Sequence, residues 1–151
     1  WHVLAWGSGK SRRNNAARIK NCREHVGTLR AAVEKAQQGD PRGAYSLLVR
    51  PGRATIPRLG PAFFTKILYF ASEDVNAKDA TRCLILDARV ARSLFDLGWA
   101  MAPTYGNNTN RFSYNWYTDT YVSYCELLRT WAASAGKGIT ADMFERALFG
   151  R

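Results

Sequence analysis

The sequence contains little histidine and little cysteine, and each scarcity excludes a class of site. Its two histidines, His2 and His25, are too few for a histidine-based metal centre or a catalytic triad. Its three cysteines, Cys22, Cys83 and Cys125, are odd in number and too widely spaced for a zinc or iron–sulfur ligand set. We therefore expect no metal and no cofactor, and we expect the thiols to be reduced and buried.

The chain also lacks any apolar run that approaches the roughly 18 residues of a membrane-spanning helix. It shows no secretory signal, and it begins at Trp1 rather than at a methionine. The reduced thiols together with these two absences predict a cytoplasmic protein without a membrane span.

Acidic residues are scarce beside basic ones, and the imbalance is concentrated early in the chain. The 22 Lys and Arg against 12 Asp and Glu give a formal charge of +10. Residues 1–60 hold 12 of the basic residues and three of the acidic ones, whereas residues 61–151 are nearly balanced. A basic surface of this size favours polyanions, so nucleic acid is the expected partner, ahead of an anionic membrane surface.

The 151 residues, 46% of them apolar, suffice for one domain or for two small helical lobes with a real core. Strand signals are nearly absent. Apolar residues from about Ser11 to Gln38 recur at steps of three and four, which predicts a long amphipathic helix. Further helices are predicted at about 41–49, 61–72, 87–97, 112–135 and 140–149, with loops that include 73–79 and 103–111. We therefore predict an all-α fold.

The segment from Trp6 to Ser11 ends in Gly-Lys-Ser, as the phosphate-binding loops of nucleotide hydrolases do. Such loops need another glycine five positions before Gly9, where this chain has Leu4, and no strand is predicted before the segment. We interpret it instead as a flexible loop that places basic residues near DNA phosphates. These basic residues are Lys10, Arg12 and Arg13.

Aromatic side chains recur with helical spacing in the predicted helix 112–135. Such a stripe could stack on bases, but at this spacing it is more often part of a core. We predict a core stripe and assign its hydroxyl groups no role. Its members are Tyr117, Tyr121, Tyr124, Leu128 and Trp131.

Two segments in the middle of the chain carry the strongest functional signal. The first segment is Ile56-Pro-Arg-Leu-Gly60, which continues as Pro61-Ala-Phe-Phe-Thr-Lys66. The second is an apolar run at 84–86 that leads into Asp87-Ala-Arg-Val-Ala-Arg92. In their order and separation these segments resemble the helix-hairpin-helix DNA glycosylase superfamily, particularly its bacterial and archaeal 8-oxoguanine DNA glycosylases. That superfamily has a Leu-Pro-Gly-Val-Gly hairpin before a helix, and later an aspartate at the end of an apolar run. The resemblance covers about residues 55–97.

The resemblance implies a two-lobed helical bundle with a helix-hairpin-helix element, built as a single glycosylase-like unit over residues 1–151. One lobe would comprise residues 1–54 and 112–151. The other would comprise residues 55–111, with the hairpin and the aspartate motif. The implied partner is double-stranded DNA with an altered base, bound by a monomer. That base would be 8-oxoguanine-like damage or a hypermodified base of foreign DNA.

Asp87 is the catalytic residue that the resemblance implies. Breaking an N-glycosidic bond builds positive charge on the sugar, and a fixed carboxylate can stabilise that charge and orient the attacking water. The alternative is that Asp87 only caps the helix that follows it, because aspartate is favoured at that position.

Lys66 is a second catalytic candidate. Glycosylases that also cut the strand use a lysine amine as nucleophile. The family's lysine position falls near Ala62, or near Leu59 in an archaeal alignment, and neither residue is lysine. Lys66 lies one helical turn beyond Ala62 and could reach the same pocket. This departure favours a monofunctional hydrolase, and Lys66 could also pair with Asp87 or with a phosphate.

Other residues are assigned to DNA contact or to the base pocket. Arg58 replaces the first glycine of the hairpin and adds a basic side chain, while Gly60 precedes a helix whose N-terminus suits a phosphate. Arg89 stands where relatives carry His or Arg, and Arg92 is interpreted as structural. Two aromatic residues, Trp6 and Phe63, are candidates for the base pocket. The alternative function is a non-enzymatic helical protein that binds DNA.

Overall fold

The computed structural model describes residues 2–3, 14–50, 53–75, 81–105 and 108–151, except for the side chains of residues 105–110. Within these residues the chain is mostly helical, which confirms the predicted helical class. The helices are α2 (Asn15–Glu24), α3 (Val26–Gln37), α4 (Pro41–Leu48), α5 (Pro61–Ala71), α6 (Ala88–Asp96), α7 (Thr118–Ala135) and α8 (Ala141–Phe149).

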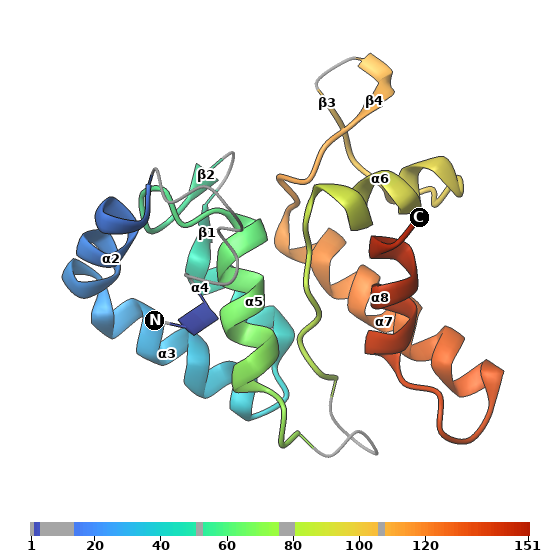
Figure 1. Ribbon diagram of the computed structural model, residues 1–151, viewed down its shortest axis with the longest axis horizontal. Coiled ribbons are helices and arrows are strands. Elements are labelled where there is room, and N and C mark those ends of the chain that lie inside the picture. The colour runs from blue at the N-terminus through green and yellow to red at the C-terminus, as the bar shows by residue number, and fades with distance from the viewer. Residues whose placement is uncertain (1, 4–13, 51–52, 76–80, 106–107) are drawn as a thin grey trace.

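The prediction of an all-α chain is wrong in detail, because two short antiparallel pairs of strands are present. β1 (Val49–Arg50) pairs with β2 (Arg53–Ala54). β3 (Thr104–Tyr105) pairs with β4 (Asn108–Phe112), in the stretch predicted as a loop. This second hairpin lies at the edge of the molecule (Figure 1). Asn-rich strands show none of the apolar alternation that marks a strand packed on a core, so the sequence does not reveal them.

The long helix predicted over Ser11–Gln38 is two helices that meet at His25. The backbone there leaves the helical region, with φ −115° and ψ 30°, and the poor helix former Gly27 follows. The change of direction lets α2 reach the turn before α5, where the Asn21 side chain donates a hydrogen bond to the Pro57 carbonyl at 2.7 Å. α3 instead packs against α4 and α5.

The helix predicted over 112–135 begins only at Thr118. The residues before it are held in an irregular path by Trp116, whose indole N–H donates to the Ser113 carbonyl at 2.7 Å. The Trp116 carbonyl in turn accepts a bond from the Tyr45 hydroxyl at 3.0 Å. Tyr117 therefore precedes α7 and is 65% exposed, so its assignment to the core stripe is wrong.

Tyr121, Tyr124 and Leu128 of the stripe lie in the core, as predicted, whereas Trp131 is only partly buried and packs against the core. Tyr121, Tyr124 and Leu128 are fully buried, and the Tyr121 ring stacks on that of Tyr45 with centroids 4.1 Å apart. One cluster of buried side chains joins residues from α2 to α8. The three cysteines are buried free thiols, as expected.

An extended segment runs between two groups of helices in Figure 1, with α2–α5 on one side and α6–α8 on the other. α4 packs against α7, and α6 packs against α8. The division into lobes of residues 1–54 with 112–151 and residues 55–111 stays a prediction, as does the helix-hairpin-helix element.

Residues 83–86 of the extended segment, which ends at Asp87, are buried without belonging to a sheet, so their backbone groups need side-chain partners. The Tyr121 hydroxyl donates to the Leu84 carbonyl at 2.8 Å and accepts from the Leu84 N–H at 3.1 Å. The Tyr124 hydroxyl donates to the Ile85 carbonyl at 2.8 Å, and the Thr65 hydroxyl accepts from the Leu86 N–H at 3.0 Å. These bonds fix the path of the chain up to Asp87.

Candidate active site

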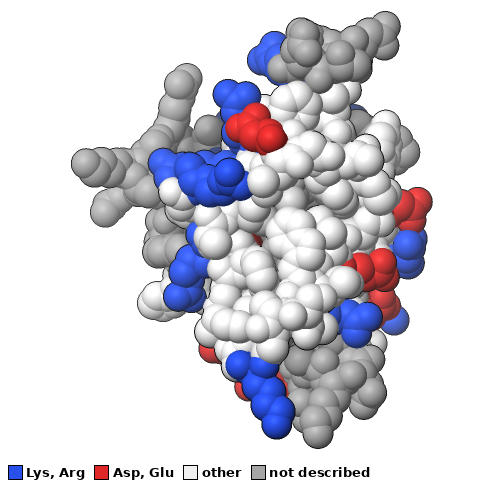
Figure 2. Space-filling view, turned by 90° about the vertical axis from the view of Figure 1, so that its right-hand side faces the viewer, with Lys and Arg blue, Asp and Glu red and all other residues white. Residues whose placement is uncertain are grey.

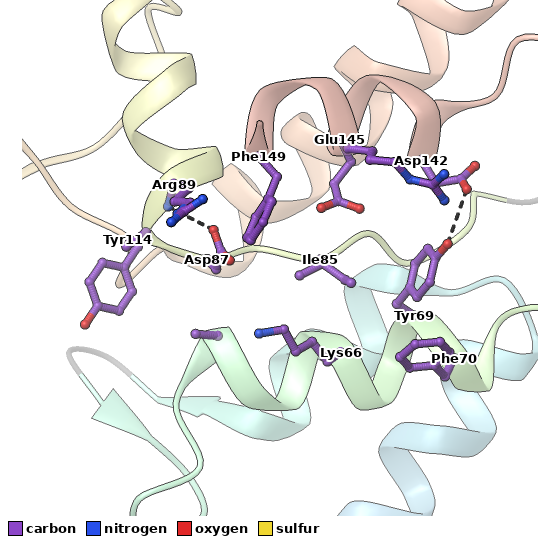
Figure 3. Close-up of a pocket in the computed structure, with 13 residues that line it drawn as sticks. Lys66, Tyr69, Phe70, Ile85, Asp87, Arg89, Tyr114, Asp142, Glu145 and Phe149 are labelled. Carbon is purple, nitrogen blue, oxygen red and sulfur yellow. Dashed lines mark hydrogen bonds between the residues drawn. The ribbon is translucent and has the colours of Figure 1, made fainter. Parts of the chain in front are cut away.

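A pocket of about 850 Å³ lies between α5, the end of the extended segment and α8. Side chains from α5 and α8 converge on the space beside Ile85 and Asp87 (Figure 3). The two predicted catalytic residues, Asp87 and Lys66, both line it. The other lining residues are Ala62, Tyr69, Phe70, Ile85, Ala88, Arg89, Tyr114, Asp142, Glu145, Arg146 and Phe149.

Asp87 caps α6, which confirms its predicted place at a helix N-terminus. One carboxylate oxygen, Oδ1, accepts hydrogen bonds from the backbone N–H groups of Arg89 at 2.9 Å and Val90 at 3.1 Å. The second oxygen, Oδ2, takes part in neither bond. The cap therefore fixes the orientation of the carboxylate at the pocket wall through Oδ1 alone.

Lys66 reaches the same pocket from the second turn of α5. Burial lowers the pKa of its amine, while the carboxyl groups of Asp87 and Glu145 act in the opposite direction. A lowered pKa increases the fraction of uncharged amine, which is the form that acts as a nucleophile.

Glu145 is a pocket residue that the sequence analysis missed. It lies on α8 and is only 8% exposed. Burial raises the pKa of its carboxyl group to about 7, and the nearby carboxylates of Asp87 and Asp142 add to the rise. The sequence held a signal for it, because Glu145 falls on the apolar stripe that Ala141, Phe144 and Leu148 form with helical spacing.

Two aromatic side chains that line the pocket are partly exposed. Phe70 of α5 is 43% exposed and Phe149 of α8 is 39% exposed. The Arg89 guanidinium lies over the Phe149 ring, 5.0 Å from its centroid. Partly exposed aromatic rings in a pocket suit stacking on a flat heterocycle, because every base offers a π-face.

Comparison with known families shows which family the chain belongs to. A family model described as "Putative 8-oxoguanine DNA glycosylase OGG-like protein" matches residues 1–149. The chain belongs to this OGG-like family. No curated protein and no solved structure matches it. Membership indicates DNA glycosylase chemistry and makes DNA the partner.

The turn before α5 in this OGG-like protein has an arginine at a backbone position that favours glycine. Arg58 adopts φ 63°, in the left-handed region that favours glycine, and the Leu59 N–H closes the turn onto the Ile56 carbonyl at 3.1 Å. The Arg58 side chain donates to Asn14 Oδ1 at 2.8 Å. Gly60 precedes α5 as its N-cap, as predicted from Pro61.

The structure brings together only some of the predicted site residues. Arg89 lines the pocket, at the start of α6. Phe63 lies outside it and packs under the Arg18 guanidinium, 3.6 Å from the ring centroid. The predicted phosphate contacts Lys10, Arg12 and Arg13 and the predicted pocket residue Trp6 lie outside the described residues.

Charge is distributed unevenly on the face that carries α7 and α8. Figure 2 shows uncharged side chains over its centre, Lys and Arg along one edge, and mixed charges along the other.

Among the described residues, no helix is both long and apolar enough to cross a membrane, and no three His, Cys, Asp or Glu side chains are grouped to hold a metal.

Proposed function

We propose that this chain removes an altered base from double-stranded DNA by turning the nucleotide out of the helix into the pocket of α5 and α8. The observation that carries the proposal is the presence of a capped carboxylate, Asp87, and a half-buried amine, Lys66, in one pocket with exposed aromatic walls. A base inside the stack is out of reach of these groups, so it must be turned out before reaction. The substrate is an 8-oxoguanine-like or a hypermodified base.

The flipped base would lie against the Phe70 and Phe149 rings, which supply stacking surfaces from opposite walls. Glu145 would then face the edge of the base. Its pKa of about 7 keeps a substantial fraction of the carboxyl group neutral near pH 7, and this form can donate one hydrogen bond and accept another, which suits the mixed donor and acceptor edge of a purine. Tyr69, bonded to Asp142 Oδ2 at 3.2 Å, closes the far end.

Asp87 would act on the sugar. The bond from C1′ to the base nitrogen breaks, the bonding electrons leave with the base, and the base takes up a proton. A water oxygen forms the new bond to C1′ and loses its proton, so the products are the free base and an abasic site. The fixed Asp87 carboxylate stabilises the positive charge on the sugar and orients or deprotonates the water.

Lys66 supports a second route. Its amine nitrogen would attack C1′ in place of water, displace the base and, after the sugar ring opens, form a Schiff base that permits strand cleavage. The structure places Lys66 in the pocket with a lowered pKa, which favours this route. The absence of lysine at Ala62 and Leu59 favours hydrolysis, and we propose hydrolysis as the main reaction.

The test uses end-labelled duplexes that each carry one altered base, together with genomic DNA rich in hypermodified bases. Wild type, Asp87→Asn and Lys66→Met are incubated with these substrates, and the products are heated in alkali. We expect alkali-dependent breaks with wild type, and at least a hundredfold slower breakage with Asp87→Asn although binding is kept. Asp119→Asn is the matched control, because Asp119 is an exposed aspartate of α7 outside the pocket.

The other outcomes separate the alternatives. Breaks before alkali, together with borohydride trapping of wild type but not of Lys66→Met, would assign the lyase route to Lys66. No release of any base, with binding retained by all variants, would contradict the proposal and favour a non-enzymatic DNA-binding protein.

A further inference from the structure

A second hollow of about 530 Å³ adjoins the pocket of α5 and α8, here called the base pocket, at the first turns of α6. The two share Ala88 and Arg89, so one opens beside the other. We call it the α6 groove. Its remaining lining residues are Arg92, Ser93, Asp96, Phe112 and Arg151.

The groove is positively charged, because three arginines and one aspartate line it. An ion pair between Arg92 and Asp96 in the groove spans 3.7 Å, and both side chains are more than half exposed. An exposed pair of this kind contributes little stability, so an incoming anion can compete for Arg92.

Two of the arginines are held in place by aromatic rings. Arg89 lies over Phe149, which also lines the base pocket, and Arg92 lies over Phe112 at 5.1 Å from its centroid. Phe112 packs in turn near Phe95, with ring centroids 6.4 Å apart. Guanidinium groups that are already stacked lose less conformational freedom on binding an anion than free ones would.

The start of α6 does not supply the usual backbone site for an anion. The N–H groups of Arg89 and Val90 are both occupied by Asp87 Oδ1. Side chains are therefore the main groups at this end of the helix that could bind a negative group. The arginines of the groove are the side chains in position to bind it.

We propose that the α6 groove binds the phosphodiester backbone next to the flipped nucleotide, with Arg92 as a phosphate-contacting residue. The inference rests on the proposed function, since a nucleotide turned into the pocket stays linked to its strand at the pocket mouth. The shared wall at Ala88 and Arg89 provides a continuous path from the pocket into the groove. Arg92, interpreted as structural from the sequence, thus becomes a binding residue.

The first experiment measures binding of a fluorescent duplex with one altered base across a range of salt concentrations. Each lost phosphate contact should lower the slope of log K against log salt by about 0.9. We expect that change for Arg92→Ala and a retained slope for Arg92→Lys. Arg42→Ala is the matched control, because Arg42 is similarly exposed and pairs with an exposed aspartate, but on α4.

The second experiment replaces single phosphates on either side of the altered base with uncharged methylphosphonates. Wild type should lose about tenfold in affinity at one flanking phosphate, whereas Arg92→Ala should be insensitive there. An equal loss in both proteins at every position, or an effect of Arg92→Ala no larger than that of Arg42→Ala, would overturn the proposal.

Base excision by the same proteins is measured in parallel at saturating enzyme. A failure of the groove proposal can then be told apart from a failure of the proposed glycosylase activity. If wild type excises the base normally but the effect of a methylphosphonate does not depend on Arg92, the groove proposal alone is overturned. Phosphate coupling to Arg92 without excision by any variant would uphold the groove as a DNA site and contradict the glycosylase activity.

Discussion

Glu145 is a buried ionisable residue whose protonation links pocket chemistry to stability. Burial and the carboxylates of Asp87 and Asp142 raise its pKa from 4.5 to about 7. Below pH 4.5 the group is protonated in both folded and unfolded chains, and its contribution to stability is fully present. As the pH rises toward 7 the unfolded chain ionises first, so this contribution is progressively lost.

Glu145→Gln should therefore remove a pH-dependent loss of stability. We expect the variant and wild type to differ little at pH 4, and the free energy of unfolding of the variant to exceed that of wild type by about 3 kcal/mol at pH 8. Urea unfolding across this pH range measures the difference. Glu126→Gln, at an exposed position of α7, is the control and should follow wild type. A constant difference between Glu145→Gln and wild type at all pH values would contradict the prediction.

Arg58 is a second residue for which one substitution tests both backbone strain and DNA binding. Its positive φ is strained for a residue with a side chain, at a cost of about 1–2 kcal/mol, whereas glycine in the same place costs about 0.5–1 kcal/mol in chain entropy. Arg58→Gly should therefore change the free energy of unfolding by less than about 1 kcal/mol while lowering the salt slope of DNA binding by about 0.9. Loss of folding in this variant would show that the side chain, rather than the turn, holds the hairpin.

At the scale of elements, the extended segment before α6 depends on side chains for its backbone hydrogen bonds. The Tyr121 hydroxyl bonds to both the N–H and the carbonyl of Leu84. Tyr121→Phe keeps the ring in the core but leaves a buried N–H and a buried C=O without that partner. We expect a loss of about 2 kcal/mol in the free energy of unfolding, measured by urea denaturation.

Tyr117→Phe serves as the control, because that side chain is 65% exposed and should tolerate the change. Since residues 83–86 lead directly into Asp87, Tyr121→Phe should also slow base excision under conditions where the protein remains folded. Excision at the wild-type rate would show that the Asp87 cap positions the carboxylate without help from the segment.

At the scale of the whole molecule, the candidate site is assembled from parts that are distant in the sequence. α5, the start of α6 and α8 each contribute one wall of the pocket. The core cluster that joins α2 to α8 holds these walls together. A change in that core is therefore expected to disturb catalysis and stability together, unlike a change in the exposed arginines of the α6 groove.

The sequence by itself determined the local features. Pro61 begins α5, Asp87 caps α6, and the helical spacing of Tyr121, Tyr124 and Leu128 places them in the core, because these features depend on neighbouring backbone and side-chain groups. The family motif also singled out Asp87, whereas Lys66 was proposed because it lies one helical turn beyond Ala62, the motif's lysine position. Local periodicity did not locate the break at His25 or the pairing of β3 with β4, because neither depends on a continuous apolar face.

Only the tertiary structure decided which distant groups meet. It brought Glu145 and Phe149 of α8 to Lys66 and Asp87, left Phe63 outside the pocket under Arg18, and joined the α6 groove to the pocket mouth. The raised pKa of Glu145 exists only because folding buries that carboxyl beside two others. Burial and charge at such sites arise from long-range packing, which leaves no periodic pattern in the sequence.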